Sequence, residues 1–148
     1  MLTQPTTELL LRGIARDLSE QIAPDLQSES AKVALGMIVQ LLNGCATRTA
    51  HEIAWMHEEA DAIMTAVAAI DDPATVAAVQ TFRAAPDDLH HDGAARRYHL
   101  ASEALAAAVE HAYATSDDTL IATLRDLLQS RSAHEMEVVG TLELVGRG

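Results

Sequence analysis

Hydrophobic side chains recur every three or four residues along the stretch from residue 27 to residue 71. Their mean spacing of about 3.5 residues is typical of an α-helix and not of a strand. We therefore predict one long helix over about 27–71, whose apolar seam the rest of the chain covers. The seam consists of Leu35, Ile38, Leu42, Cys45, Thr49, Ile53, Met56, Ala60, Ile63, Val67 and Ile70.

The dipeptide Asn43-Gly44 raises an alternative within this helix. Asn-Gly commonly ends a helix, and Thr49 with Glu52 would form a capping box for a second one. The segment would then be two helices, over about 26–43 and 50–71. Against this, the seam keeps its phase across the dipeptide, and one interior glycine costs only about 1 kcal/mol relative to alanine. We favour a continuous helix, with a bend or break near Gly44 as the alternative.

Four further helices are predicted from the same periodicity and from their end signals. The first covers about 6–23 and ends there because the residue before Pro24 avoids the α region. Asp25 or Ser28 can cap the long helix that follows it. A short helix over 73–84 follows Asp72, a good cap, and two longer ones cover about 90–114 and 117 to the high 130s. Residues 138–145 fit a helical continuation, a short strand or a tail. The predicted inward positions are Leu11, Ile14, Leu18 and Ile22; Val76, Val79 and Phe82; Tyr98, Ala101, Leu105, Val109 and Ala112; and Leu120, Ile121, Leu124, Leu127 and Leu128.

Length and composition agree with an all-α fold. The chain has 148 residues, 49% of them hydrophobic, and only four are aromatic. Alanine, the strongest helix former, supplies much of the apolar content. The prediction is therefore a single all-helical domain over 1–148, an elongated bundle of about five helices built around the long one.

The charge excludes several classes of partner. The formal net charge is −12, so nucleic acid and anionic membranes are poor partners. No apolar run is long enough to span a bilayer, and no signal-peptide pattern opens the chain, so a cytoplasmic location is expected. Cys45 is the only cysteine, and its place on the seam predicts a small buried thiol.

The long helix also suggests self-association. At 1.5 Å per residue it would be about 67 Å long, which exceeds the diameter of a compact domain of this size. Antiparallel pairing with a second copy would cover its apolar ends, so we expect a homodimer through this helix. On its other face, Trp55 lies between polar neighbours and can anchor a partner. The candidate interface residues are His51, Ile53, Trp55, Met56 and Glu58.

A helical bundle that binds a metal ion or a small ligand through His/carboxylate pairs is the alternative function. His57 with Asp61, and His99 with Glu103, are each four residues apart, which places two ligands on one helical face. Two such pairs could hold Fe, Mn or Zn in a helical bundle. His99 and Glu103 lie away from their helix's apolar stripe, however, so we expect solvated polar faces, no cofactor and no catalytic residue.

Two segments carry a resemblance to a known group of proteins. Leu11-Arg12-Gly13-Ile14-Ala15-Arg16-Asp17-Leu18 and His51-Glu52-Ile53-Ala54-Trp55-Met56-His57-Glu58-Glu59 resemble small uncharacterised all-helical bacterial proteins. Those proteins accompany aminoglycoside-phosphotransferase-like kinases and acyl-CoA dehydrogenases. The resemblance covers about a third of the chain and implies an accessory role beside an enzyme, with no site residue to carry over. Non-enzymatic self-association, with an enzyme as a second partner, is therefore the leading hypothesis.

Overall fold

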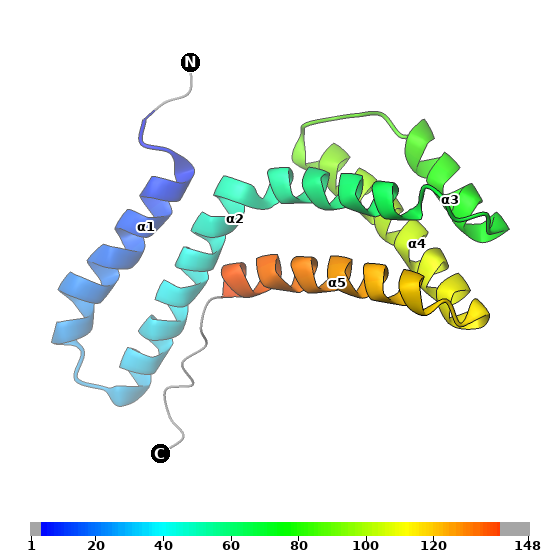
Figure 1. The fold of residues 1–148 in the computed structure, drawn as a ribbon. Coiled ribbons are helices and arrows are strands. Elements are labelled where there is room, and N and C mark those ends of the chain that lie inside the picture. Colours follow the sequence, from blue (N-terminus) through cyan, green and yellow to red (C-terminus); the bar gives the residue numbers. More distant parts are fainter. Residues whose placement is uncertain (1–3, 140–148) are drawn as a thin grey trace. The chain divides into compact units, whose positions relative to one another are not determined.

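The protein is all-α, as a computed structural model of residues 4–139 shows (Figure 1). Its five α-helices are the number predicted, and no strand occurs among these residues. Val138 and Val139 continue the last helix, whereas the rest of the ambiguous segment 138–145 lies outside the described residues. The helices are α1 (Thr7–Asp17), extended by a π-helical turn (Leu18–Ile22) and a 3-10 turn (Ala23–Asp25), then α2 (Glu29–Val67), α3 (Pro73–Ala84), α4 (His91–Thr115) and α5 (Asp118–Val139).

Side-chain caps set several helix boundaries. Thr6 caps α1, and its Oγ1 accepts a hydrogen bond from the Leu9 amide at 3.3 Å. Ser28 and not Asp25 caps α2, because the Ala31 amide donates to Ser28 Oγ at 3.4 Å. Asp72 caps α3 as predicted, accepting from the Thr75 amide at 2.9 Å. Hydrogen bonds to the first unpaired amides are the reason that these residue types begin helices.

The long helix is continuous through Asn43-Gly44. It runs from Glu29 to Val67, so the break considered near Gly44 does not occur, and each end is a few residues shorter than predicted. The unbroken phase of the seam was therefore the better guide to the helix than the local Asn-Gly signal.

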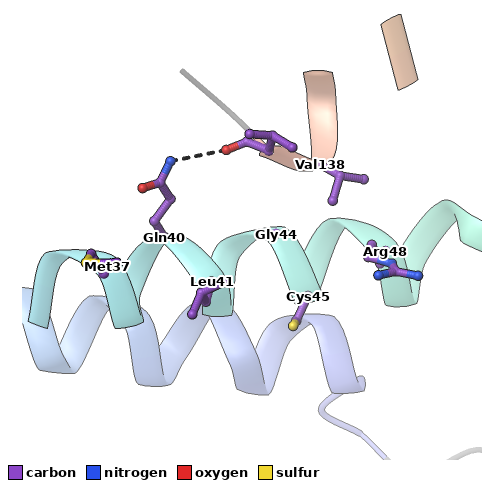
Figure 2. Close-up of a pocket in the computed structure, with 8 residues that line it drawn as sticks. Met37, Gln40, Leu41, Gly44, Cys45, Arg48 and Val138 are labelled. Carbon is purple, nitrogen blue, oxygen red and sulfur yellow. Dashed lines mark hydrogen bonds between the residues drawn. The ribbon is translucent and has the colours of Figure 1, made fainter. Parts of the chain in front are cut away.

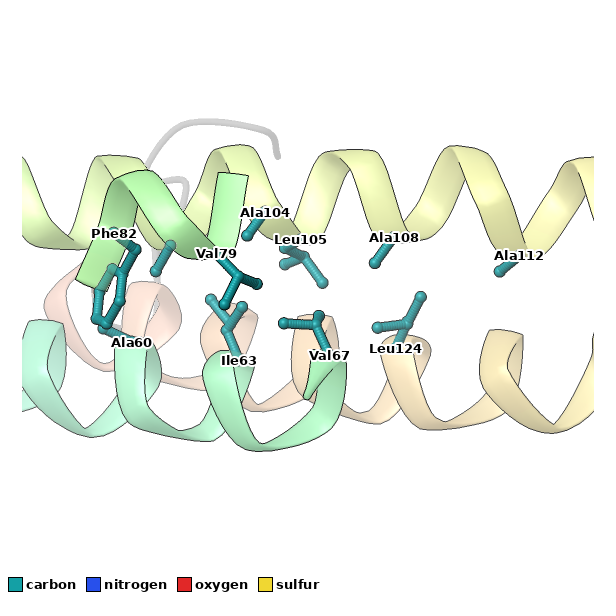
Figure 3. Close-up of a cluster of buried hydrophobic side chains, with 11 residues drawn as sticks. Ala60, Ile63, Val67, Val79, Phe82, Ala104, Leu105, Ala108, Ala112 and Leu124 are labelled. Carbon is teal, nitrogen blue, oxygen red and sulfur yellow. The ribbon is translucent and has the colours of Figure 1, made fainter. Parts of the chain in front are cut away.

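The chain divides into two compact units, and α2 contributes to both. The first unit comprises Met1–Glu52 and Ala133–Gly148, and the second comprises Ile53–Ser132. In the second unit, the C-terminal part of α2 packs with α3, α4 and most of α5 around one apolar core (Figure 3). Four α4 alanines in this core (Ala101, Ala104, Ala108 and Ala112) are fully buried and allow the neighbouring helices to approach closely.

The first unit has a much smaller core. There α1 lies beside the N-terminal part of α2 (Figures 1 and 2). Of its described apolar residues, only Ala15, Leu35 and Ala46 are buried. Two of these are alanines, so the first unit buries little apolar surface. Its large apolar side chains that remain exposed are Leu9, Leu10, Ile14, Ile22, Val33, Met37, Ile38, Leu41, Met136 and Val139.

Several predicted core positions are therefore wrong. Cys45 and Thr49 are both exposed, although the seam predicted them to be buried. In the second unit, Thr75 is fully buried in place of Val76, with its hydroxyl donating to Asp72 Oδ2 at 3.0 Å. The periodicity identified apolar faces correctly but could not show which of them the chain itself covers. The other predicted inward residues that are exposed are Ile14, Ile22, Ile38, Ile53, Val76 and Leu128.

Candidate interaction surface

The predicted interface residues are only partly available on the surface. His51 and Glu58 are exposed, whereas Trp55 and Met56 are half-buried. Ile53 is 37% exposed. These side chains therefore offer less open apolar surface than the N-terminal part of α2 does.

The four candidate metal ligands do not form a cluster. The His99 Nε2 lies 3.3 Å from Glu103 Oε1, and both side chains are exposed, as expected from their position on the helix. His57 is half-buried and its Nε2 has no hydrogen-bond partner, whereas Asp61 is exposed. Among the residues from 4 to 139, no three His, Cys, Asp or Glu side chains are grouped so that they could hold a metal ion. The geometry thus gives the metal hypothesis no support.

A polar cluster in the second unit was not predicted. The Tyr98 hydroxyl donates to Glu59 Oε2 at 2.8 Å, and the Arg131 guanidinium lies over the Tyr98 ring, 4.7 Å from its centroid. Arg131 Nε is 4.0 Å from Glu59 Oε2, and its Nη1 donates to Ser102 Oγ at 3.4 Å. The cluster links α2, α4 and α5. Since the residues lie far apart in sequence, no local spacing could have revealed it.

Two groups of polar contacts shift pKa values near helix ends. The His90 Nδ1 lies 2.7 Å from Asp88 Oδ1, and this contact raises the pKa of His90. The pKa of Asp88 is lowered, first by the hydrogen bond from the His90 amide. Hydrogen bonds from Thr75 lower the pKa of Asp72 as well, and His111, 3.6 Å away, adds to the effect. The Asp88–His90 contact is therefore a local turn, whereas Asp72 both caps α3 and lies beside His111 of α4.

A row of exposed apolar side chains lies on α2 in the first unit. Val33, Met37, Leu41 and Cys45 follow one another at steps of four residues, which keeps them on one side of the helix. Met37 is 62% exposed and Leu41 is 68% exposed, both far above the values of core residues. We call these four residues the α2 stripe. A row of large exposed apolar side chains on one face is typical of a protein–protein contact.

A pocket with a volume of about 340 Å³ lies over the α2 stripe (Figure 2). The last turn of α5 forms part of its wall, where the Val139 carbonyl accepts a hydrogen bond from Gln40 Nε2 at 3.2 Å. Gly44 allows this turn to approach, since a Cβ at this position would lie only 2.8 Å from the Val138 carbonyl oxygen. The pocket is lined by Met37, Gln40, Leu41, Gly44, Cys45, Arg48, Val138 and Val139.

Arg48 provides the positive charge beside the pocket. Its Nε donates to Glu52 Oε1 at 2.9 Å, and this hydrogen bond raises the pKa of Arg48 above its ordinary value. The guanidinium therefore stays charged at any physiological pH and already has a carboxylate partner. The pocket is consequently apolar with a neutralised rim, which suits an apolar side chain better than a charged ligand.

The sequence carried a signal for this surface that the periodicity did not use. None of the 22 residues from 30 to 51 is Asp or Glu, and this is the longest acid-free stretch in a chain with a net charge of −12. The α2 stripe lies within it. In an acidic protein, such a stretch is where two chains can approach with the least repulsion.

Comparison of the chain with models of protein families, with curated proteins and with solved structures found no match. The resemblance to small helical bacterial proteins therefore stays a prediction. Among the described helices, none combines the length and apolar character needed to cross a membrane.

Proposed function

We propose that this protein is a non-enzymatic, self-associating interaction module that uses the apolar surface of its first unit. The single observation that carries the proposal is the contrast within that unit. Its described part buries only Ala15, Leu35 and Ala46 but leaves ten large apolar side chains exposed. Exposed apolar surface is typical of protein–protein interfaces when it is large and unusual for the size of the core.

Energetics support the need for a partner. A unit of about 60–70 residues is marginally stable even when it has a full core of its own. Covering one large apolar side chain contributes about 1.5–3 kcal/mol, so half-exposed side chains leave much of that stabilisation unused. A partner that covers α1 and α2 would supply it.

An accessory role beside an enzyme is the second part of the proposal. It follows from the resemblance of residues 11–18 and 51–59 to proteins that accompany kinases and acyl-CoA dehydrogenases. In such a complex, the half-buried Trp55 with its polar neighbours would be a surface separate from the α2 stripe.

Light scattering coupled to size exclusion tests self-association. We expect the wild-type mass to exceed that of one chain, and Leu41→Asp to shift the protein to monomer. A carboxylate in place of a buried Leu would weaken the dimer by at least about 100-fold, because burying an unpaired charge costs several kcal/mol. Leu89→Asp is the matched control, since Leu89 is 74% exposed but lies in the second unit.

Leu89→Asp should leave the mass unchanged. Circular dichroism should show the same helix content for both variants, because both sites are exposed. A wild-type protein that stays monomeric up to millimolar concentration would refute the proposal.

A further inference from the structure

We propose that α2 packs antiparallel against α2 of a second copy, with Leu41 at the twofold axis and the partner's Met37 in the pocket beside Cys45. This inference rests on the proposed self-association and specifies its geometry. The pocket would then be completed only by the second copy. In a twofold interface each contact occurs twice, so Met37 would also enter the partner's pocket.

The exposed apolar area fits a second copy of this chain. Burying a large apolar side chain contributes about 1.5–3 kcal/mol, at about 25 cal/mol per Å² of apolar surface. A fully exposed side chain of this kind therefore presents roughly 60–120 Å² of apolar surface. Eight such side chains on α1, its extension and α2 are about half exposed, which gives roughly 240–480 Å² per copy. Interfaces are about 56–65% apolar, so this area corresponds to roughly 400–850 Å² of interface per copy. A standard dimer buries about 800 Å² per partner, and small ones about 600 Å².

The order of side chains along the α2 stripe allows it to pack against an antiparallel copy of itself. Leu41 is its most exposed large residue, with Met37 one turn before it and Cys45 one turn after it. If Leu41 meets its own copy, Met37 lies opposite Cys45 on the partner. A long side chain is thereby placed against the smaller cysteine, which is the complementarity that packed helices need.

The charges along α2 are compatible with the antiparallel direction. Lys32 and Arg48 are the only Lys, Arg, Asp or Glu residues between Glu29 and Glu52. Parallel pairing would place each Arg48 against its own copy. Antiparallel pairing about Leu41 separates the two Arg48 residues by about 21 Å along the helix axis. Two helical hairpins joined in this way form a four-helix bundle, a common stable arrangement.

Disulfide cross-linking tests this geometry, because Cys45 is the only cysteine in the chain. Antiparallel pairing about Leu41 places the two Cys45 Cα atoms about 15 Å apart, from the helix rise and a usual axis separation. A disulfide needs Cα atoms within about 7 Å. Wild-type protein should therefore not cross-link under an added oxidant such as copper-phenanthroline.

Two variants should cross-link at least about ten times faster than wild type. Leu41→Cys combined with Cys45→Ser places two cysteines at the axis. Met37→Cys with native Cys45 places a cysteine opposite the partner's Cys45. The matched control, Met37→Cys combined with Cys45→Ser, should not cross-link. The three positions, Met37, Leu41 and Cys45, are all exposed on α2, so circular dichroism should confirm an unchanged fold.

Each other pattern has a distinct meaning. Rapid cross-linking of wild type and of the Met37→Cys, Cys45→Ser control would show parallel pairing and overturn the inference. A dimer by light scattering in which no variant cross-links would place the interface elsewhere, which overturns the inference but leaves the proposed function. A monomer at every concentration would overturn both.

Discussion

Replacing Gly44 with alanine tests the close approach between α2 and the end of α5. The substitution removes the flexibility of a glycine within a helix, which by itself stabilises the folded state by about 0.5–1 kcal/mol. At Gly44, however, the new Cβ would lie 2.8 Å from the Val138 carbonyl oxygen. Because real Cβ atoms essentially never approach so closely, the last turn of α5 must move.

The structure limits how much stability Gly44→Ala can cost through this movement. Moving the end of α5 can break the Gln40–Val139 hydrogen bond, worth about 0.5–1.5 kcal/mol, and part of the packing of half-buried Val138. The gain in helix propensity and the loss of these contacts therefore nearly cancel. We expect Gly44→Ala to range from neutral to destabilising by about 1 kcal/mol.

Gly36→Ala is the matched control in the same helix. No atom lies within 4 Å of a Cβ at Gly36. Gly36→Ala should therefore raise the free energy of unfolding by the full amount, about 0.5–1 kcal/mol, that alanine contributes within a helix. Urea unfolding followed by circular dichroism should separate the two variants by about 0.5–2 kcal/mol. Hydrogen exchange at the last turn of α5 should accelerate only in Gly44→Ala. Equal stabilisation by both substitutions would refute the close approach at Gly44.

Three further predictions concern the second unit. Leu124→Ala should destabilise by about 2–5 kcal/mol in urea unfolding, and Leu128→Ala by at most about half as much, because Leu124 is 2% exposed and Leu128 is 45% exposed. Ser116→Gly should raise the melting temperature by about 2–4 °C, since Ser116 has a φ of 54°; a decrease would contradict this. NMR titration should give His90 a pKa above its ordinary value, and Asp88→Asn should return that pKa to the ordinary value. The contact stabilises the folded state below about pH 6.5, and this stabilisation is lost as the pH rises through the raised pKa.

Helix boundaries followed closely from the sequence because their signals are local. Asp72 and Pro73 begin α3, and α3 ends at Ala84 just before the residue that precedes Pro86, as predicted. The continuity of α2 also followed, since the phase of its apolar residues reports on the whole helix. A cap or a phase depends on neighbours within a few residues, which the sequence places directly.

Burial and the candidate site could not be predicted in the same way. Periodicity gives Cys45 and Ile63 equal places on one seam, but Cys45 is exposed and Ile63 is 3% exposed. The difference arises because α3, α4 and most of α5 surround the later part of α2 with one apolar core, whereas the first unit has only three buried apolar residues among its described ones. The pocket likewise needs Val138 beside Gly44, two residues that are far apart in the chain. Contacts between distant segments decide both features, and no local pattern encodes them.

The continuity of α2 has a consequence for the order in which the protein folds. Starting a helix is unfavourable, whereas extending an existing helix by one residue is close to neutral. The second unit has the larger core and can hold Ile63 and Val67 in helical form. From there, the helix can extend backwards toward Glu29 without a new nucleus. Amide exchange along α2 should then slow steadily from residue 29 toward residue 63, because the early turns are helical only when the later turns are already formed.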